Sequence, residues 1–149
     1  MKTNDKSIFE LANECIPHLI KGASKEQINK QESVLKCAFP SDYIDFLQYT
    51  NGGEVYDGDI TLFSIYVSSS KVNIRNTIGF VNRTEMSNAL LPASYLIIGE
   101  YNFGDIIAID KNSGCVIQWS HEYNNIFLSY DSFKEFLESI VEEHHAYES

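Results

Sequence analysis

The stretch that decides the fold runs from Tyr95 to Trp119 and reads YLIIGEYNFGDIIAIDKNSGCVIQW. It contains three short apolar runs, at 96–98, 106–109 and 116–119, which are rich in β-branched and aromatic residues. Each run is too short for a helix and is bounded by Gly, Asn or Asp, so each predicts a strand. The connector Asp110–Gly114 has hairpin composition, because Asn and Gly tolerate the positive φ of a tight reversal. The stretch therefore predicts an antiparallel meander whose inner face the rest of the chain must cover.

The pattern continues past Trp119, where Ile126–Tyr130 predicts one more strand. The central meander then spans about residues 95–130. Gly99 and Gly104 bracket its first turn, and we expect Glu100 and Asp105 to lie exposed beside them.

Two helices are predicted near the N-terminus. Apolar residues at i, i+3, i+4 and i+7 begin at Ile8 and stop before Pro17, which has no backbone N–H to donate. Ser24 and Gln27 then form a capping box, which predicts a mostly polar helix to about Lys36.

A third helix is predicted after Pro40, with Ser41 as its N-cap and apolar residues at helical spacing. Asn51-Gly52-Gly53 should end it, because Asn and Gly can take the left-handed conformation that follows a helix.

The last helix has the clearest pattern in the chain. Ser132 and Glu135 form a second capping box. A full apolar stripe follows, made of Phe133, Phe136, Leu137, Ile140 and Val141. Residues 142–149 are polar and are predicted to form a frayed tail.

The region between residues 54 and 91 gives weaker patterns. It starts with an acidic loop and continues with a strand over Ile60–Val67 and a turn at 68–70. Val72–Met86 fits either a strand or a short helix, of which we favour the helix. No linker or repeat divides the 149 residues, so we expect residues 1–149 to form one domain.

The net charge of −10 is unevenly distributed along the chain. Residues 1–36 hold six lysines and five acidic residues, whereas residues 37–149 hold five basic and sixteen acidic residues, a balance of −11. Such a field repels nucleic acid and anionic membranes and attracts a basic partner. The simpler interpretation is that the charge serves solubility.

The cysteines and the N-terminus bear on the compartment. Cys15, Cys37 and Cys115 are odd in number and isolated, so they predict free thiols in a reducing compartment and no disulfide or zinc site. No secretory signal and no apolar run of about 18–20 residues is present. We therefore expect a cytoplasmic protein that does not enter a membrane.

Motifs for catalysis or cofactor binding are weak. The glycines at 99 and 104 lack the Lys-Ser/Thr of a phosphate loop. A calcium loop starting at Asp110 would place Cys115 where glycine is required. The sequence thus predicts no metal and no cofactor.

His121 is the histidine for which a catalytic role is considered, because it follows the strand that ends at Trp119. A small hydrolase could use it as a general base with Asp105 or Asp110, or with Glu122 orienting the ring. The commoner role of such a histidine is to pack at the strand end and bind a loop. The loop acids, among them Asp57 and Asp59, are more simply explained as a solvated or partner-facing rim.

Two groups of motifs resemble the SUKH superfamily, which contains the fungal Smi/Knr glucan-synthesis regulators and many bacterial immunity proteins. The first group is Glu32 and Leu35, Phe39-Pro40-x-Asp42-Tyr43-x-x-Phe46-Leu47 and Asn51-Gly52-Gly53. The second is Ile98-Gly99, Gly104-Asp105, Ile109-Asp110, Gly114, Val116, Trp119 and Ser132-Phe133-x-x-Phe136-Leu137. The match spans about residues 24–141. Phe39 replaces the usual Leu, and Phe63 stands where many members carry Trp.

The resemblance implies an α+β domain in which helices from both ends of the chain back a mainly antiparallel sheet. It also implies a non-enzymatic role, typically an immunity protein that neutralises a nuclease or deaminase toxin. A regulatory scaffold of the Smi/Knr kind, with an endogenous partner, is the alternative.

These expectations combine into one hypothesis for the site. An acidic surface with aromatic anchors would cover a basic toxin domain and steer its association. The candidate partner-binding residues are Asp57, Asp59, Glu100, Tyr101, Asp105, Asp110, Glu122 and Tyr123, with Tyr56 as a further aromatic anchor.

Overall fold

Six antiparallel strands form one sheet in the order in which they occur along the chain, β1-β2-β3-β4-β5-β6. The computed structural model describes residues 6–67, 74–84 and 91–148. The strands are β1 Gly53–Val55, β2 Ile60–Leu62, β3 Tyr95–Tyr101, β4 Ile106–Asp110, β5 Val116–Ser120 and β6 Asn125–Tyr130. The meander predicted over 95–130 is confirmed as β3–β6, including the turn after Asp110.

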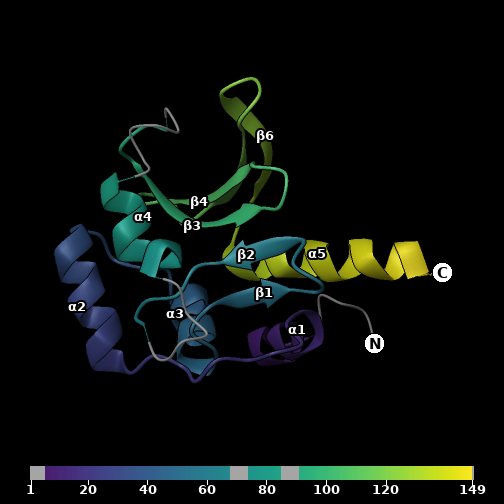
Figure 1. Ribbon diagram of the computed structural model, residues 1–149, viewed down its shortest axis with the longest axis horizontal. Helices are drawn as coiled ribbons and strands as arrows, with labels where there is room; N and C mark the ends of the chain where they lie inside the picture. Colours follow the sequence, from purple (N-terminus) through teal and green to yellow (C-terminus); the bar gives the residue numbers. More distant parts are fainter. Residues whose placement is uncertain (1–5, 68–73, 85–90, 149) are drawn as a thin grey trace.

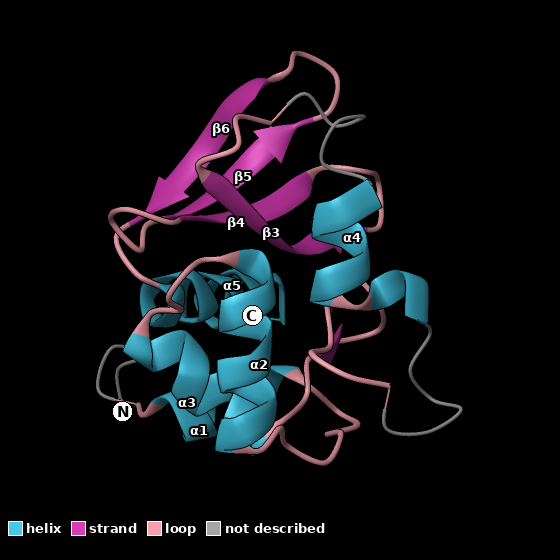
Figure 2. Cartoon of the chain, turned by 90° about the vertical axis from the view of Figure 1, so that its left-hand side faces the viewer, coloured by secondary structure: helices cyan, strands magenta, loops and turns pink. Residues whose placement is uncertain are grey.

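Helices cover the sheet, so the predicted single α+β domain is confirmed. They are α1 Ile8–Cys15, α2 Lys25–Leu35, α3 Ser41–Tyr49, the 3₁₀ turn η2 Ile74–Asn76, α4 Ile78–Thr84 and α5 Phe133–Glu148. Helices α1 and α3 pack against α5, and α4 packs against β3. Figures 1 and 2 show α1, α3 and α5 in a layer beside the twisted β3–β6 sheet. The N- and C-terminal segments therefore meet in the same layer.

The core is centred on aromatic residues from α3 and α5. The ring of Phe133 lies 5.0 Å from that of Tyr43 and 4.9 Å from that of Phe46, measured between centroids. Phe39 adds its ring at 5.6 Å from Tyr43. These residues and Phe136 are at most 5% exposed. The motifs in the two halves of the chain thus form one cluster, whose burial is the main stabilising term.

Two glycines of the motifs are required by the backbone. Gly52 has a φ of 74°, and a Cβ there would lie 2.4 Å from the carbonyl oxygen of Leu62. Gly99 follows a β-bulge at Ile98, and a Cβ there would lie 2.6 Å from the carbonyl oxygen of Thr61. A side chain at Gly52 would push the loop away from β2, and a side chain at Gly99 would push β3 away from β2.

The start of α3 differs from the prediction. Pro40, not Ser41, occupies the N-cap position, and no side-chain hydrogen bond caps the helix there. The Pro40 nitrogen carries no hydrogen, and its fixed φ suits the entry to a helix. The end of α3 follows the prediction only in part, because Thr50 is an extended C-cap and the left-handed residue is Gly52.

The region after α3 also differs. Only Ile60–Leu62 of the strand predicted over 60–67 joins the sheet, and Gly53–Val55, predicted as a loop, pairs with it. Beyond Leu62 the chain leaves the sheet, and Ser64 makes an isolated bridge to Thr77. The predicted helix over 72–86 appears in its described part as η2 and α4. The turn predicted at 68–70 lies outside the described residues.

Capping boxes at Ser7 and Ser24 satisfy backbone N–H groups at the starts of α1 and α2. At the start of α5, the Ser132 hydroxyl accepts a hydrogen bond from the Glu135 N–H. At its other end α5 continues through 142–148, where the sequence predicts a frayed tail. Contacts to other elements explain the difference, because the His145 Nε2 lies 2.5 Å from a carboxylate oxygen of Glu14 on α1. The hydrogen bond from Lys6 and the pairing with His145 hold the pKa of the Glu14 carboxyl below its usual value, against the opposing effect of burial.

Candidate partner-binding surface

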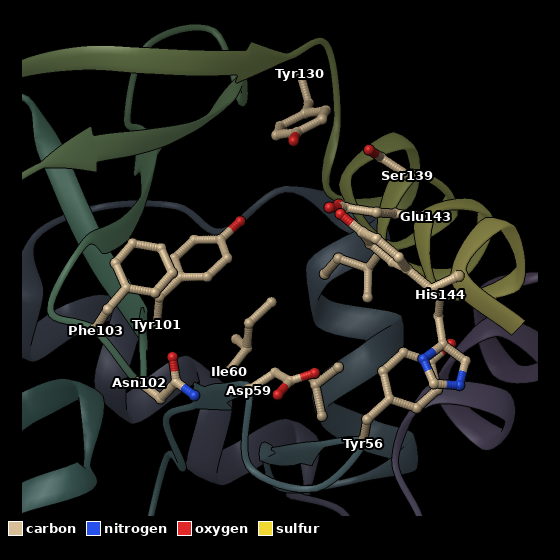
Figure 3. Close-up of a pocket in the computed structure, with 13 residues that line it drawn as sticks. Tyr56, Asp59, Ile60, Tyr101, Asn102, Phe103, Tyr130, Ser139, Glu143 and His144 are labelled. Carbon is tan, nitrogen blue, oxygen red and sulfur yellow. The ribbon is translucent and has the colours of Figure 1, made fainter.

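A cleft of about 280 Å³ lies between α5 and the turns that follow β1 and β3. Its walls are mainly aromatic and aliphatic, with two carboxylates (Figure 3). They are formed by Val55, Tyr56, Asp59, Ile60, Tyr101, Asn102, Phe103, Tyr130, Ser139, Ile140, Glu143, His144 and Tyr147. No lysine or arginine is among these described residues.

Three polar groups converge at the upper end of the cleft. Figure 3 shows the hydroxyl groups of Tyr101 and Tyr130 and the carboxylate of Glu143 directed toward the same space. Burial, and next the neighbouring Tyr130 and Glu143, raise the pKa of the Tyr101 hydroxyl. Within the described part of the chain, none of these three side chains makes a hydrogen bond or an ion pair. They are therefore available to a group that enters the cleft.

The opposite end of the cleft is closed by a stacked pair. The rings of Tyr56 and His144 lie 3.6 Å apart between centroids, at an interplanar angle of 14°. Tyr56 has a φ of 52°, a strained value for a bulky residue. This contact holds the turn after β1 against α5, which keeps the two walls of the cleft in place.

A second, more open hollow lies on the other side of α5 and shares Tyr130 and Ser139 with the cleft. Its remaining residues include three glutamates of α5 at i, i+3 and i+7, namely Glu135, Glu138 and Glu142. We call these three residues the glutamate stripe. Burial raises the pKa of the Glu138 carboxyl, and Glu142 and Glu135 raise it further, while Lys134 acts in the opposite direction. The stripe therefore places three like charges close together, and their repulsion disfavours the ionised form of Glu138.

Four of the eight predicted partner-binding residues lie near the cleft. Asp59 and Tyr101 line it, and Asp57 is exposed in the same turn as Asp59. Glu100 is exposed next to Tyr101 on β3. A separate pair, Glu122 and Tyr123, is exposed in the turn between β5 and β6, and Tyr123 is 76% exposed.

The prediction that Asp105 is exposed is wrong, because its side chain is buried. Its Oδ2 accepts a hydrogen bond from Gln118 Nε2 at 2.8 Å, and its Oδ1 accepts one from the His121 backbone N–H at 3.1 Å. The Nδ1 atom of His121 lies 2.5 Å from the same Oδ1. Burial raises the pKa of the Asp105 carboxyl, but the hydrogen bonds from Gln118 and His121 outweigh it, so the pKa lies below its usual value. Asp105 ties the β3–β4 turn to the end of β5.

The His121–Asp105 pair has the geometry of a base and the carboxylate that orients it. The same contacts serve a structural purpose, since Asp105 also accepts from the His121 backbone N–H, just after β5, and from the Gln118 amide. Asp110 lies at the other end of β4, where its Oδ1 accepts from the Asn112 N–H at 2.8 Å in the hairpin turn. The hypothesis that pairs His121 with Asp110 is therefore wrong, and Asp110 is not among the residues that line the cleft.

Two features of this surface are not predicted from the sequence patterns above. The glutamate stripe was not singled out, although its i, i+3, i+7 spacing on the best-predicted helix places it on one face. The edge strand β6 was expected as an ordinary strand, yet Ile126, Phe127 and Leu128 are 44–64% exposed. Phe127 is the extra residue of a bulge, because Leu128 and Ile126 pair with consecutive residues of β5.

The described residues also bear on metal binding and on membrane insertion. They contain no group of three or more His, Cys, Asp or Glu side chains arranged to hold a metal ion. Among the helices they form, none has the length and apolar character needed to cross a membrane. All three cysteines are free thiols, and burial raises the pKa of the Cys15 thiol to about 12.

Comparisons with known proteins agree with this fold. A crystal structure of a protein from Pseudomonas syringae pv. tomato superposes with a TM-score of 0.68 over 91% of this chain and 97% of that chain, at 17% identity. The uncharacterized protein YnaB of Bacillus subtilis (strain 168) is 30% identical over 95 residues, which are 64% of this chain. The match covers 55% of YnaB, so the chain spans about half the length of this relative. Residues 22–139 match the SMI1 / KNR4 family (SUKH-1), and the chain belongs to that family.

Proposed function

We propose that this protein is a non-enzymatic, cytoplasmic immunity protein that neutralises a basic toxin domain by stoichiometric binding. The observation that carries the proposal is the surface along α5, where an aromatic cleft with Asp59 and Glu143 adjoins the glutamate stripe. No lysine or arginine lines either hollow among the described residues. The surface offers unneutralised charge and large aromatic side chains in one place.

Physical chemistry links such a surface to a basic protein partner. Nuclease and deaminase domains bind nucleic acid phosphates through basic residues, and an acidic surface can occupy that region. Tyrosines in a partly buried setting supply contact area at low entropic cost, as in the centres of protein interfaces. Membership of the SUKH-1 family supports this role, because immunity proteins are common in the superfamily.

Co-expression with toxins tests the proposal. Genes adjacent to the one for this chain would be expressed under a tight promoter, with and without this protein. We expect one neighbouring product to arrest growth and this protein to restore it. The purified pair should form a 1:1 complex whose affinity falls as sodium chloride rises, since exposed charges are screened over a Debye length of about 10 Å at 0.1 M. If no neighbouring product is toxic, or if growth arrest persists, the proposal fails.

The His121–Asp105 pair supports a second candidate, a small hydrolase. Replacing His121 with Ala separates the two functions, because a general base is essential to catalysis and a residue at the strand end is not essential to binding. We expect the His121→Ala protein to protect against the toxin as well as the wild type does. Loss of protection from a variant that still folds and still binds the toxin would favour catalysis.

A further inference from the structure

We propose that the aromatic cleft beside α5 receives a single arginine side chain from the protein partner. The inference depends on the proposed function for its partner and specifies how that partner is recognised. Its basis is the chemistry of the cleft walls, the absence of lysine and arginine among the described lining residues and the polar groups at the upper end that make no hydrogen bond within the described residues.

The size of the cleft favours a side chain over a cofactor. Its volume of about 280 Å³ lies just under the roughly 300–1,000 Å³ usual for small-molecule sites. The lining also lacks the glycine-rich backbone that a nucleotide phosphate requires. One long side chain, entering from a partner that covers the opening, matches these dimensions.

The walls fit the two parts of an arginine side chain. The rings of Tyr101 and Phe103, 5.2 Å apart, form one wall on which a planar guanidinium can stack. The apolar side chains of Ile60 and Ile140 can cover its aliphatic stem. A guanidinium carries five N–H donors, and the cleft presents acceptors for them.

Three of those acceptors, on Tyr101, Tyr130 and Glu143, make no hydrogen bond or ion pair within the described residues. The Glu143 carboxylate can accept two parallel N–H bonds, and the hydroxyl oxygens of Tyr101 and Tyr130 can accept further ones. Asp59 adds a second negative charge lower in the cleft (Figure 3). A lysine ammonium has three donors around a point charge and cannot stack in the same way, so arginine should be preferred.

Nuclear magnetic resonance titration with a model compound tests the inference without any toxin. The probe is N-acetyl-L-arginine amide, and N-acetyl-L-citrulline amide is the neutral compound of nearly the same shape. N-acetyl-L-lysine amide tests the choice of cation. Ionic strength is held constant with sodium chloride. We expect arginine amide to shift the signals of Tyr101, Tyr130 and Glu143, with a dissociation constant of about 1–100 mM.

Two variants that each replace one helix glutamate by glutamine give a matched comparison. Glu143→Gln should weaken arginine binding by roughly two- to fivefold, the range for an exposed ion pair. Glu26→Gln removes the same charge from the exposed side of α2, outside the residues that line either hollow, and should leave binding unchanged. Equal effects of the two variants, equal shifts with citrulline amide, or equal affinity for lysine amide would overturn the inference.

The arginine titration can succeed or fail independently of the toxin co-expression experiment. Arginine binding with no toxin found would retain the site and reject the immunity role. A toxin complex whose affinity is unaffected by Glu143→Gln, together with no arginine binding, would retain the immunity role and reject the site.

Discussion

The carboxylate of Asp42 on α3 accepts a hydrogen bond from the backbone N–H of Lys134 on α5, at 2.9 Å and across 92 positions of sequence. Its other oxygen accepts from the N–H of Tyr43 at 2.8 Å. Asp42 therefore satisfies one of the free N–H groups in the first turn of α5. It joins two motifs that the sequence shows only as separate patterns.

Replacing Asp42 with Ala should lower the free energy of unfolding by about 1–2 kcal/mol, the cost of losing a helix cap. Urea denaturation followed by circular dichroism measures this value. Asp45 lies three residues further along the same helix, is exposed and makes no side-chain hydrogen bond or ion pair within the described residues. Asp45→Ala should change stability by less than about 0.5 kcal/mol, and equal losses in both variants would contradict the capping role.

Asn51 should contribute more to the free energy of unfolding than the Asp42 cap does. Its Oδ1 accepts from the Ile65 N–H at 2.7 Å and its Nδ2 donates to the Tyr66 carbonyl at 2.9 Å, in a fully buried site. Asn51→Ala leaves both backbone groups without partners, so we expect a loss of about 2–4 kcal/mol in a denaturation experiment. Asn29→Ala, on the exposed face of α2, is the control and should not destabilise the protein.

Asp105 should make stability fall in acid. Its carboxyl has a pKa below the ordinary value of 3.8, so its ionised form is favoured by folding. The contribution is complete above pH 3.8 and is lost as the pH falls through the lower pKa of the folded state. Denaturation of Asp105→Asn across this range should show a smaller fall than the wild type. Parallel curves for the two proteins would show that another carboxylate is responsible.

Glu138 should have the opposite effect. Its pKa is raised above the ordinary 4.5, so the ionised form is disfavoured by folding, and stability should rise as the pH falls through the raised pKa of the folded state. At neutral pH, Glu138→Gln should stabilise the protein by a few tenths of a kcal/mol, because like charges at i, i+3 and i, i+4 repel each other. The same variant should weaken toxin binding. A complex that Glu138→Gln leaves unchanged would exclude the glutamate stripe from the interface.

Cys15 should resist thiol reagents in the folded protein. It is fully buried, and burial raises its pKa to about 12, so very little reactive thiolate exists at neutral pH. Mass spectrometry after brief alkylation should find Cys15 unmodified in buffer and modified in denaturant. Modification in buffer at the rate of a free thiol would show that α1 opens readily.

Local patterns allowed most of the elements to be predicted. Apolar stripes marked α1, α3 and α5, and short β-branched runs between turn residues marked β3–β6. The same reasoning failed between Gly53 and Ser64, because β1 and β2 have three residues each. They are stabilised by pairing, β2 with β3 and β1 with β2, and not by their own composition.

The amino-acid sequence determined the overall charge and the alternation of apolar and polar positions, and that alternation predicted most of the helices and the meander. Only the tertiary structure decided which polar groups would meet. It buried Asp105 under Gln118 and His121, and it brought Tyr101 of β3 to Tyr130 and Glu143 near the other end of the chain. Periodicity depends on neighbours along the chain, whereas burial and contact depend on segments that come together only when the chain folds.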